Sequence, residues 1–187
     1  MSHKRPISAQ PNSATLIPSS FVVFLLVPIA KPHGSTVTYR SLMILRPCHG
    51  PSEFPALVAI WRSAVDATHD FLATAHRDAI ETKLASDYFP AVTLTVAEQD
   101  GAPVGFAGTA EGCLEMLFVH DDVRGRGVGT ALLNHVLPDA SDLEVNEQNP
   151  EAVAFYESRG YTVVGRREHD DFGMPYPFIQ MRRIRGK

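Results

Sequence analysis

Hydrophobic and polar positions alternate along the middle of the chain with the period of a β-sheet. Valine and leucine alternate with threonine over 92–96, and the pair Asp100-Gly101 that follows favours a tight hairpin turn. Apolar segments at 104–110 and 113–119 continue the series, with a second turn signal between them. The pattern therefore predicts three consecutive antiparallel strands.

Apolar residues at helical spacing lie before and after these strands. Ser52, a favoured N-cap residue, is expected to begin a helix whose apolar face carries Leu57, Ile60, Trp61 and Val65. Further helices are predicted at about 74–84, 127–136 and 150–159, and further strands at about 43–46, 143–145, 161–167 and 178–183.

The order of these elements predicts one mixed α/β domain. A helical crossover joins the strands at 113–119 and 143–145, so these two are expected to run parallel. A chain of 187 residues with 44% hydrophobic and 20% charged residues is long enough to bury one core and has the composition of a globular protein. We expect a monomer or a homodimer.

A loop of alternating glycines separates the strand at 113–119 from the next helix. Gly125, Gly127 and Gly129 have no side chains, so their N–H groups can approach a ligand closely. The helix N-terminus carries partial positive charge, to which Arg124 and Arg126 add two formal charges. This loop is therefore a candidate cradle for a pyrophosphate group.

Four interpretations of the loop can be compared by their spacing. A P-loop needs a Gly-Lys-Ser/Thr ending, which is absent. A dinucleotide site needs G-x-G-x-x-G directly after the strand and a later acid such as Glu144, but here five residues, 120–124, precede G-x-G-x-G. The third pattern, Arg-x-x-Gly-x-Gly at Arg124, Gly127 and Gly129, resembles the acyl-CoA motif of the GNAT superfamily of N-acetyltransferases. An ordinary glycine-rich loop is the fourth interpretation.

A second motif follows at the distance expected within that superfamily. Asn149, Ala152, Tyr156, Gly160 and Tyr161 form the pattern Asn-x-x-Ala-x-x-x-Tyr-x-x-x-Gly-Tyr, which resembles the second GNAT motif at every position. Asn149 is also a favoured N-cap residue, and Gly160 suits the position just past a helix end. Taken without the resemblance, Tyr156 is a half-buried aromatic residue of an amphipathic helix.

The resemblance can be narrowed to one branch of the superfamily. The segments IWRSAVDATHDFL, NEQNPEAVAFY and GRREHDDFGMPYP resemble the YjaB-type branch, and the similarity runs from about Met43 to Arg183. It implies a mixed α/β GNAT fold with a splayed central sheet, acetyl-CoA in the splay, no metal, and acetyl transfer to a primary amine, often a protein lysine. A non-catalytic module that binds acyl-CoA as a sensor is the alternative.

The resemblance also implies roles for individual residues. Tyr156 is the candidate acid for the departing thiolate, and backbone N–H groups at 117–119 are candidate donors to the oxyanion. Asn149 contacts the pantetheine or the acceptor in relatives. The implied cofactor-binding residues are Leu117, Phe118, Val119, Arg124, Gly125, Arg126, Gly127, Val128, Gly129, Thr130, Asn149 and Tyr156.

The sequence offers more than one candidate for the general base that deprotonates the amine. Glu115 lies two and four residues before Leu117 and Val119, so strand alternation puts all three on one face, where a carboxylate is an unusual choice unless something polar meets it. Glu144, on the predicted strand at 143–145, is the alternative candidate for the base. Residues expected on the acceptor side are Asp66, His69 and Glu144, with Asp170 and Asp171 as groups that help to attract a cationic amine. His69 titrates near neutrality and can act as a base or as a substrate contact. Each of these residues could instead be an ordinary surface residue.

Charge and cysteine content narrow the partners. The net charge of −4 argues against nucleic acid, which normally requires a basic surface, and suits a cationic amine. The only two cysteines, Cys48 and Cys113, give no disulfide framework and no cluster of metal ligands, which is typical of a cytoplasmic protein.

The first 42 residues have a different character from the rest. Residues 1–20 are rich in serine and proline and lack an apolar repeat, so the segment 1–42 is expected to be a disordered extension, and 43–187 the acetyltransferase domain. The apolar run at 21–30 is far shorter than the ~20 residues that span a bilayer, so no membrane association is expected. Met43 could be the start of the native protein.

Overall fold

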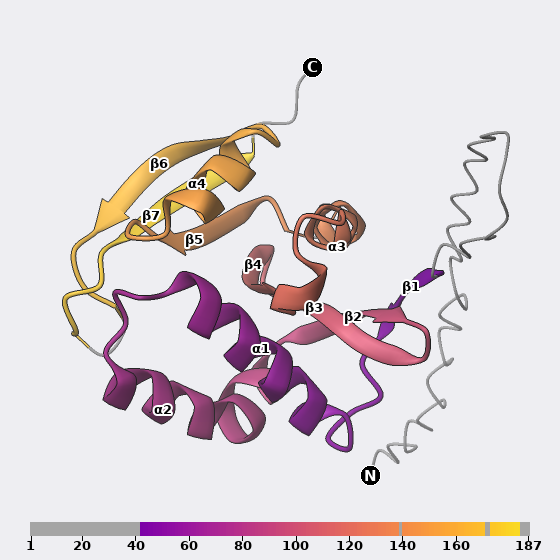
Figure 1. Cartoon of the computed structure of the whole chain (residues 1–187). Coiled ribbons are helices and arrows are strands. Elements are labelled where there is room, and N and C mark those ends of the chain that lie inside the picture. Colours follow the sequence, from indigo (N-terminus) through magenta and orange to yellow (C-terminus); the bar gives the residue numbers. More distant parts are fainter. Residues whose placement is uncertain (1–41, 139, 171–172, 184–187) are drawn as a thin grey trace, which may run out of the picture.

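The computed structural model describes residues 42–138, 140–170 and 173–183. In these residues a seven-stranded mixed sheet carries α-helices on both faces (Figure 1). The strands are β1 (Met43–Pro47), β2 (Thr93–Gln99), β3 (Ala102–Ala110), β4 (Cys113–Val119), β5 (Asp142–Asn146), β6 (Tyr161–Arg167) and β7 (Phe178–Arg183). The helices are α1 (Phe54–Thr68), α2 (Thr74–Lys83), α3 (Val128–Val136) and α4 (Pro150–Glu157), with short turns η1 (Leu84–Tyr88), η2 (Phe89–Ala91) and η3 (Asp121–Val123).

The predicted antiparallel strands β2, β3 and β4 are confirmed. β2 pairs with β3, and β3 with β4, through two tight turns. Asp100 and Gly101 have φ values of 52° and 79°, and Glu111 and Gly112 have 50° and 86°. Positive φ at both central residues gives a turn whose twist matches that of the flanking strands, which explains why Asp-Gly and Glu-Gly occur there.

The sheet opens between β4 and β5. The strand order is β1-β2-β3-β4-β5-β7-β6, and β4 and β5 run parallel as predicted. Their pairing comprises only Cys113 with Asp142 and Leu114 with Leu143, after which β5 continues beside β7 alone. Figure 1 shows β5, β7 and β6 diverging from β4 as a separate wing. One edge of β4 therefore has no strand partner from residue 115 onward.

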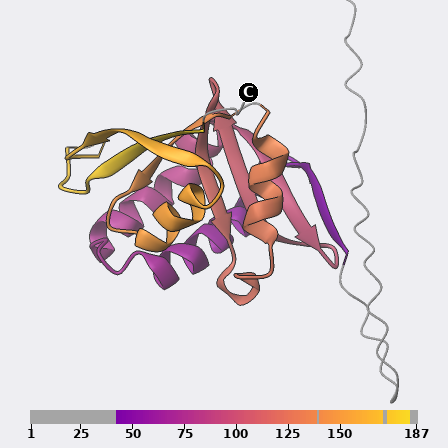
Figure 2. The same cartoon turned by 90° about the horizontal axis from the view of Figure 1, so that it is seen from above.

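Two hydrophobic cores hold the layers together. One lies between the sheet and the helices α3 and α4, with Leu132, Leu133 and Tyr161 almost fully buried. The other lies between β2, β3 and β4 and the helix α1, around Leu57 and Phe106. Figure 2 shows α3 and α1 on opposite sides of these strands. Because both faces are covered, the β4–β5 opening is bounded by packed helices.

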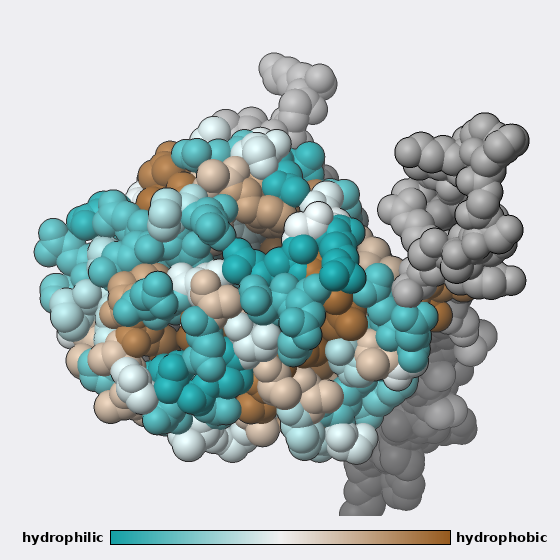
Figure 3. Space-filling view, viewed as in Figure 1, coloured by the Kyte–Doolittle hydropathy of each residue, from teal (hydrophilic) through white to brown (hydrophobic). Residues whose placement is uncertain are grey.

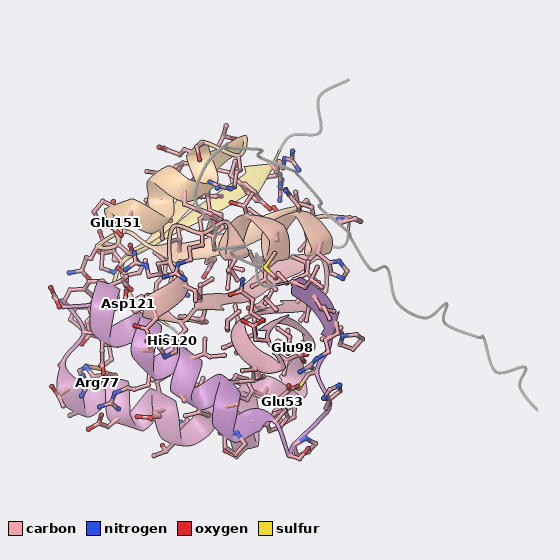
Figure 4. All side chains as sticks on the ribbon, turned by 45° about the vertical axis from the view of Figure 1, so that its right-hand side comes forward. Glu53, Arg77, Glu98, His120, Asp121 and Glu151 are labelled. Carbon is pink, nitrogen blue, oxygen red and sulfur yellow. The ribbon has the colours of Figure 1, made fainter. Side chains whose placement is uncertain are left out.

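Two predicted helix boundaries were wrong. Ser52 does not cap α1, because Glu53 occupies the N-cap position, without a side-chain cap bond. The Glu53 carboxylate instead accepts hydrogen bonds from Arg46 (2.5 Å) and from the backbone N–H of His49 (2.9 Å), and these lower the pKa of Glu53 to about 2. At its other end, α4 stops two residues earlier than predicted. Figure 4 labels Glu53 beside Glu98, the second carboxylate that Arg46 contacts.

The predicted extension at 1–42 lies, except for Leu42, outside the described residues. No helix in the part of the chain that the structure describes is both long enough and apolar enough to cross a membrane.

Candidate active site

Two cavities lie along the open edge of β4. The larger, about 410 Å³, is formed by β4, the glycine loop, α3 and α4. The smaller, about 260 Å³, is formed by α1, the turn after it, β4, β5 and the loop between β6 and β7. The residues that line both cavities are His69, Leu117, Phe118, Asn149, Ala152 and Tyr156. The cavities therefore meet at a junction, which we define by these six residues.

The glycine loop is open to the larger cavity. Gly125 and Gly127 have φ values of 72° and 87°, and Gly127 is the N-cap residue of α3. A Cβ built on either glycine would meet no atom within 4 Å, so the space in front of the loop is not filled by protein. Open space at a helix N-terminus, bordered by N–H groups, fits a pyrophosphate.

The two arginines of the loop differ. Arg124 lines the larger cavity and contacts Glu151 at 2.6 Å and Asp121 at 3.4 Å. Figure 4 shows both carboxylates on one side of the molecule. Arg126 is exposed and lines neither cavity. The predicted pair of loop charges is thus reduced to one arginine, and its charge is already offset by two carboxylates.

Arg159 is a cation of the larger cavity that the sequence analysis missed. Its guanidinium lies 3.6 Å from the centre of the Phe155 ring, and Nη2 donates to Thr130 Oγ1 at 2.6 Å. Its Nε–H is buried and has no hydrogen-bond partner in the described residues. A buried donor without a partner destabilises a protein by about 1–3 kcal/mol, and a phosphate oxygen is a strong acceptor for guanidinium. The site therefore fits an anionic ligand.

The backbone of β4 presents alternate N–H groups to the opening. The N–H of His120 donates to Val104 O at 2.9 Å, toward β3. In an antiparallel pair every second residue points its N–H the same way, so Phe118 also faces β3, and Leu117 and Val119 face the open edge. Of the three predicted oxyanion donors, only Leu117 and Val119 thus have their N–H groups on the cavity side. Phe118 contributes its ring.

Tyr156 lies at the junction on α4. It is 8% exposed and packs against the rings of Phe155 and Tyr161, at 5.2 and 5.7 Å between centres. Burial raises the pKa of its phenol, because the charged phenolate is disfavoured away from water. The hydroxyl has no hydrogen-bond partner among the described residues. Tyr156 is therefore a neutral phenol that can donate its proton into the junction.

Glu115 lines the smaller cavity at an irregular point of β4. Met116 pairs with Gly108 and Leu114 with Thr109, so Glu115 is the extra residue of a β-bulge. The simple alternation used in the prediction holds only after this bulge, where Leu117 packs in the first core and Met116 in the second. Glu115 is an exposed residue on the wall of this cavity.

The other predicted acids are engaged elsewhere. Glu144 lines the smaller cavity, but its carboxylate contacts Arg167 at 2.6 Å and Gln180 at 2.9 Å. Asp66 lines neither cavity and contacts Arg77 at 2.8 Å. It belongs to the charged surface of α1 and α2, where Figure 3 shows hydrophilic side chains gathered. Asp170 lines the smaller cavity, and Asp171 lies outside the described residues.

Long-range contacts close the smaller cavity. The Tyr176 hydroxyl lies 2.6 Å from His76 Nδ1, which joins the β6–β7 loop to α2 across 100 residues of sequence. The rings of Phe71 and Phe178 also line this cavity.

Asn149 caps α4 as predicted, with Oδ1 accepting from the N–H of Ala152 at 3.1 Å, which leaves its NH₂ group for a ligand. No three His, Cys, Asp or Glu side chains in the described residues are placed to hold a metal.

The sequence and the fold are similar to those of known acetyltransferases. Residues 63–183 match the family described as Acetyltransferase (GNAT) domain. The chain is 48% identical over 128 residues to the peptidyl-lysine N-acetyltransferase YjaB of Salmonella typhimurium, covering 67% of this chain and 88% of the relative. The structure is similar to that of apo YjaB from Escherichia coli, with a TM-score of 0.70 and 40% identity over 77% of this chain and 99% of the other. The fold is shared with the PaiA N-acetyltransferase of Thermoplasma acidophilum, solved with coenzyme A, at a TM-score of 0.60 and 14% identity over 76% and 99% of the two chains.

Proposed function

This chain belongs to the GNAT family of acetyltransferases, and from that premise we propose that it transfers the acetyl group of acetyl-CoA to lysine side chains of proteins. Membership of this family makes the chain an N-acetyltransferase but does not identify the amine that accepts the acetyl group. The observation that supports the proposal is the junction. There the larger cavity, which suits an anionic cofactor, meets the smaller cavity, which is lined by acidic and aromatic side chains, at the phenol of Tyr156.

The larger cavity is the proposed site of acetyl-CoA. The open loop at Gly125 and Gly127 suits the pyrophosphate, and the orphan Nε–H of Arg159 suits a phosphate oxygen. The unpaired edge of β4 offers backbone groups to the amides of the pantetheine arm, as a missing strand would. The thioester then lies at the junction.

The residues of the junction divide the reaction between them. As the amine nitrogen bonds to the carbonyl carbon, the N–H groups of Leu117 and Val119 donate to the oxygen that becomes negative. The C–S bond then breaks, and Tyr156 gives its proton to the thiolate. The phenol carries its proton at neutral pH, since even the ordinary tyrosine pKa is about 10 and burial raises the pKa of Tyr156 further. Glu115, exposed at the acceptor cavity, is the proposed base that removes the first proton from the incoming ammonium.

A lysine side chain fits the acceptor cavity. The cavity carries the carboxylates of Glu115 and Asp170, which attract a cation, and aromatic rings along its walls, which pack against an aliphatic stem. The names of the similar YjaB proteins state peptidyl-lysine acetylation. Free thiols at Cys48 and Cys113 suit a reducing compartment, so we place the reaction in the cytoplasm.

An acetyl-transfer assay tests the acceptor. The full chain is given acetyl-CoA with a lysine peptide whose N-terminus is blocked, with the same peptide carrying arginine for lysine and a free N-terminus, or with a small diamine. Release of free thiol measures turnover, and mass spectrometry locates the acetyl group. We expect acetylation of the lysine nitrogen of the first peptide. Exclusive modification of the free N-terminus or of the diamine would contradict the proposal.

A further inference from the structure

His69 is a polar residue of the junction to which the proposed reaction gives no role. It follows the last residue of α1, and its backbone N–H donates to Val65 O at 2.9 Å while its carbonyl accepts from the N–H of Leu72 at 2.9 Å. Both backbone groups are thus fixed by the turn between α1 and α2. The side chain lines both cavities, so it faces the point where acetyl group and amine must meet.

A chain of two hydrogen bonds sets the tautomer of the ring. The hydroxyl of Thr68 donates its single proton to the carbonyl of Ala64 at 2.8 Å. The same oxygen lies 2.7 Å from His69 Nδ1. Because the hydroxyl proton is already used, the Thr68 oxygen is the acceptor in this second contact and Nδ1–H is the donor. A neutral imidazole protonated at Nδ1 has its lone pair at Nε2.

The surroundings of the ring keep it neutral. Burial lowers the pKa of His69 to about 4, and the Phe71 ring lies 5.1 Å from the imidazole. The ionisable groups that share its cavities are Arg124, Glu151 and Arg159 in the larger one, Glu115, Glu144, Asp170 and Tyr176 in the smaller one, and Tyr156 in both. No ion pair joins His69 to a carboxylate of the described residues. At neutral pH the lone pair of Nε2 is therefore available.

We propose that His69 Nε2 accepts the second proton of the amine, the one released as the C–N bond forms. This inference rests on the proposed acetyl transfer. The neutral amine adds to the thioester, and its nitrogen becomes strongly acidic as the carbonyl re-forms, so a weak base is sufficient. The N–H proton passes to Nε2, the C–S bond breaks, and Tyr156 gives its proton to the thiolate. The imidazolium then returns a proton to Tyr156, which restores both residues and leaves an amide and a thiol.

The tautomer can be tested without measuring activity. In the isotope-labelled full chain, nitrogen chemical shifts of the imidazole report which nitrogen carries the proton. We expect His69 to be neutral, with the proton on Nδ1, from pH 7.5 down to pH 5.5. A ring protonated at Nε2, or a ring charged at pH 5.5, would overturn the proposal whether or not the acceptor is lysine.

Variants test the role in turnover. In His69→Asn the amide can still donate toward Thr68 but nothing replaces Nε2, so we expect turnover to fall by about 10²-fold or more with acetyl-CoA affinity changed less than about threefold. The matched control is His135→Asn on the exposed side of α3, which should retain wild-type turnover. Equal loss of affinity and turnover in His69→Asn would show a merely structural role. Wild-type chain that acetylates no amine would contradict the proposed function instead, and the tautomer result would stand by itself.

Discussion

The two cavities are built in different ways. The larger one draws most of its wall from residues 117–130 and 149–159, two segments that present backbone N–H groups, glycines and the N-termini of α3 and α4. The smaller one collects side chains from segments as far apart as Trp61 and Phe178. Backbone geometry tolerates few substitutions, whereas a wall of side chains can vary. We call the larger cavity, the proposed site of acetyl-CoA, the cofactor half, and the smaller cavity the acceptor half. We infer that local sequence fixes the cofactor half and that the acceptor half determines which amine is acetylated.

The largest effect is expected where the two halves meet. Tyr156→Phe removes the phenolic proton and keeps the ring, so turnover should fall by roughly 10²- to 10⁴-fold while the Kd for acetyl-CoA stays nearly constant. Stopped-flow turnover and calorimetry measure the two quantities. Tyr161→Phe is the control, because this buried phenol contacts Ala140 O and lines neither cavity. Wild-type turnover in Tyr156→Phe, with chemistry limiting, would exclude the acid role.

The cofactor half should be the more sensitive to a change of backbone. Gly127→Val places a branched side chain at φ 87° in the space proposed for the pyrophosphate, so acetyl-CoA affinity should fall by at least about 100-fold. Gly101→Val is the matched control, since it has φ 79°, equally open space and a place in the β2–β3 turn. Calorimetry that finds equal affinity in both folded variants would refute the cradle.

Arg159 distinguishes the phosphate-bearing end of the ligand from the thiol end. A hydrogen bond to a charged group contributes about 1.5–3 kcal/mol, so Arg159→Gln should weaken CoA binding by roughly 10- to 100-fold and leave pantetheine binding unchanged. Dephospho-CoA tells whether the 3′-phosphate or the pyrophosphate is the partner. Equal losses for CoA and pantetheine would mean that Arg159 only supports the packing of Phe155 and Thr130.

The smallest effect is expected on the acceptor side. Tyr176→Phe removes the hydroxyl that joins the β6–β7 loop to His76 and to the N–H of Ala73. One neutral hydrogen bond is worth about 1 kcal/mol, so KM for the lysine peptide should rise by about fivefold, with acetyl-CoA affinity unchanged. Steady-state kinetics with each substrate varied in turn measures both. A change in acetyl-CoA affinity alone would contradict the division into two halves.

The sequence predicted the elements around the larger cavity better than the walls of the smaller one. Turn residues, caps and the glycine loop act within a few positions of one another, so the hairpins, the cap at Asn149 and the parallel β4–β5 pair followed from local rules. The errors arose where a residue distant in the sequence determines the position of a side chain. Glu53 displaced Ser52 because Arg46 holds its carboxylate, and the place of Arg159 depends on Thr130, 29 residues away.

The acceptor half depends on contacts that no local pattern encodes. His76 and Tyr176 meet across 100 positions, and either could have been an ordinary surface residue. Glu115 was found by strand alternation, but the bulge that sets its position follows from pairing with β3. His69 was recognised only as a candidate, since its tautomer follows from the Thr68 hydroxyl and its neutrality from burial.

The short pairing of β4 with β5 has a consequence for the length of the acyl group. The opening between the strands closes at Leu114 and Leu143, the last paired residues, whose side chains are buried. Leu114 lines the smaller cavity, so this closed end limits the depth of the acceptor side. We expect an acetyl group to stay at the junction. A longer acyl chain would have to extend from the junction into the smaller cavity, where it would compete with the amine.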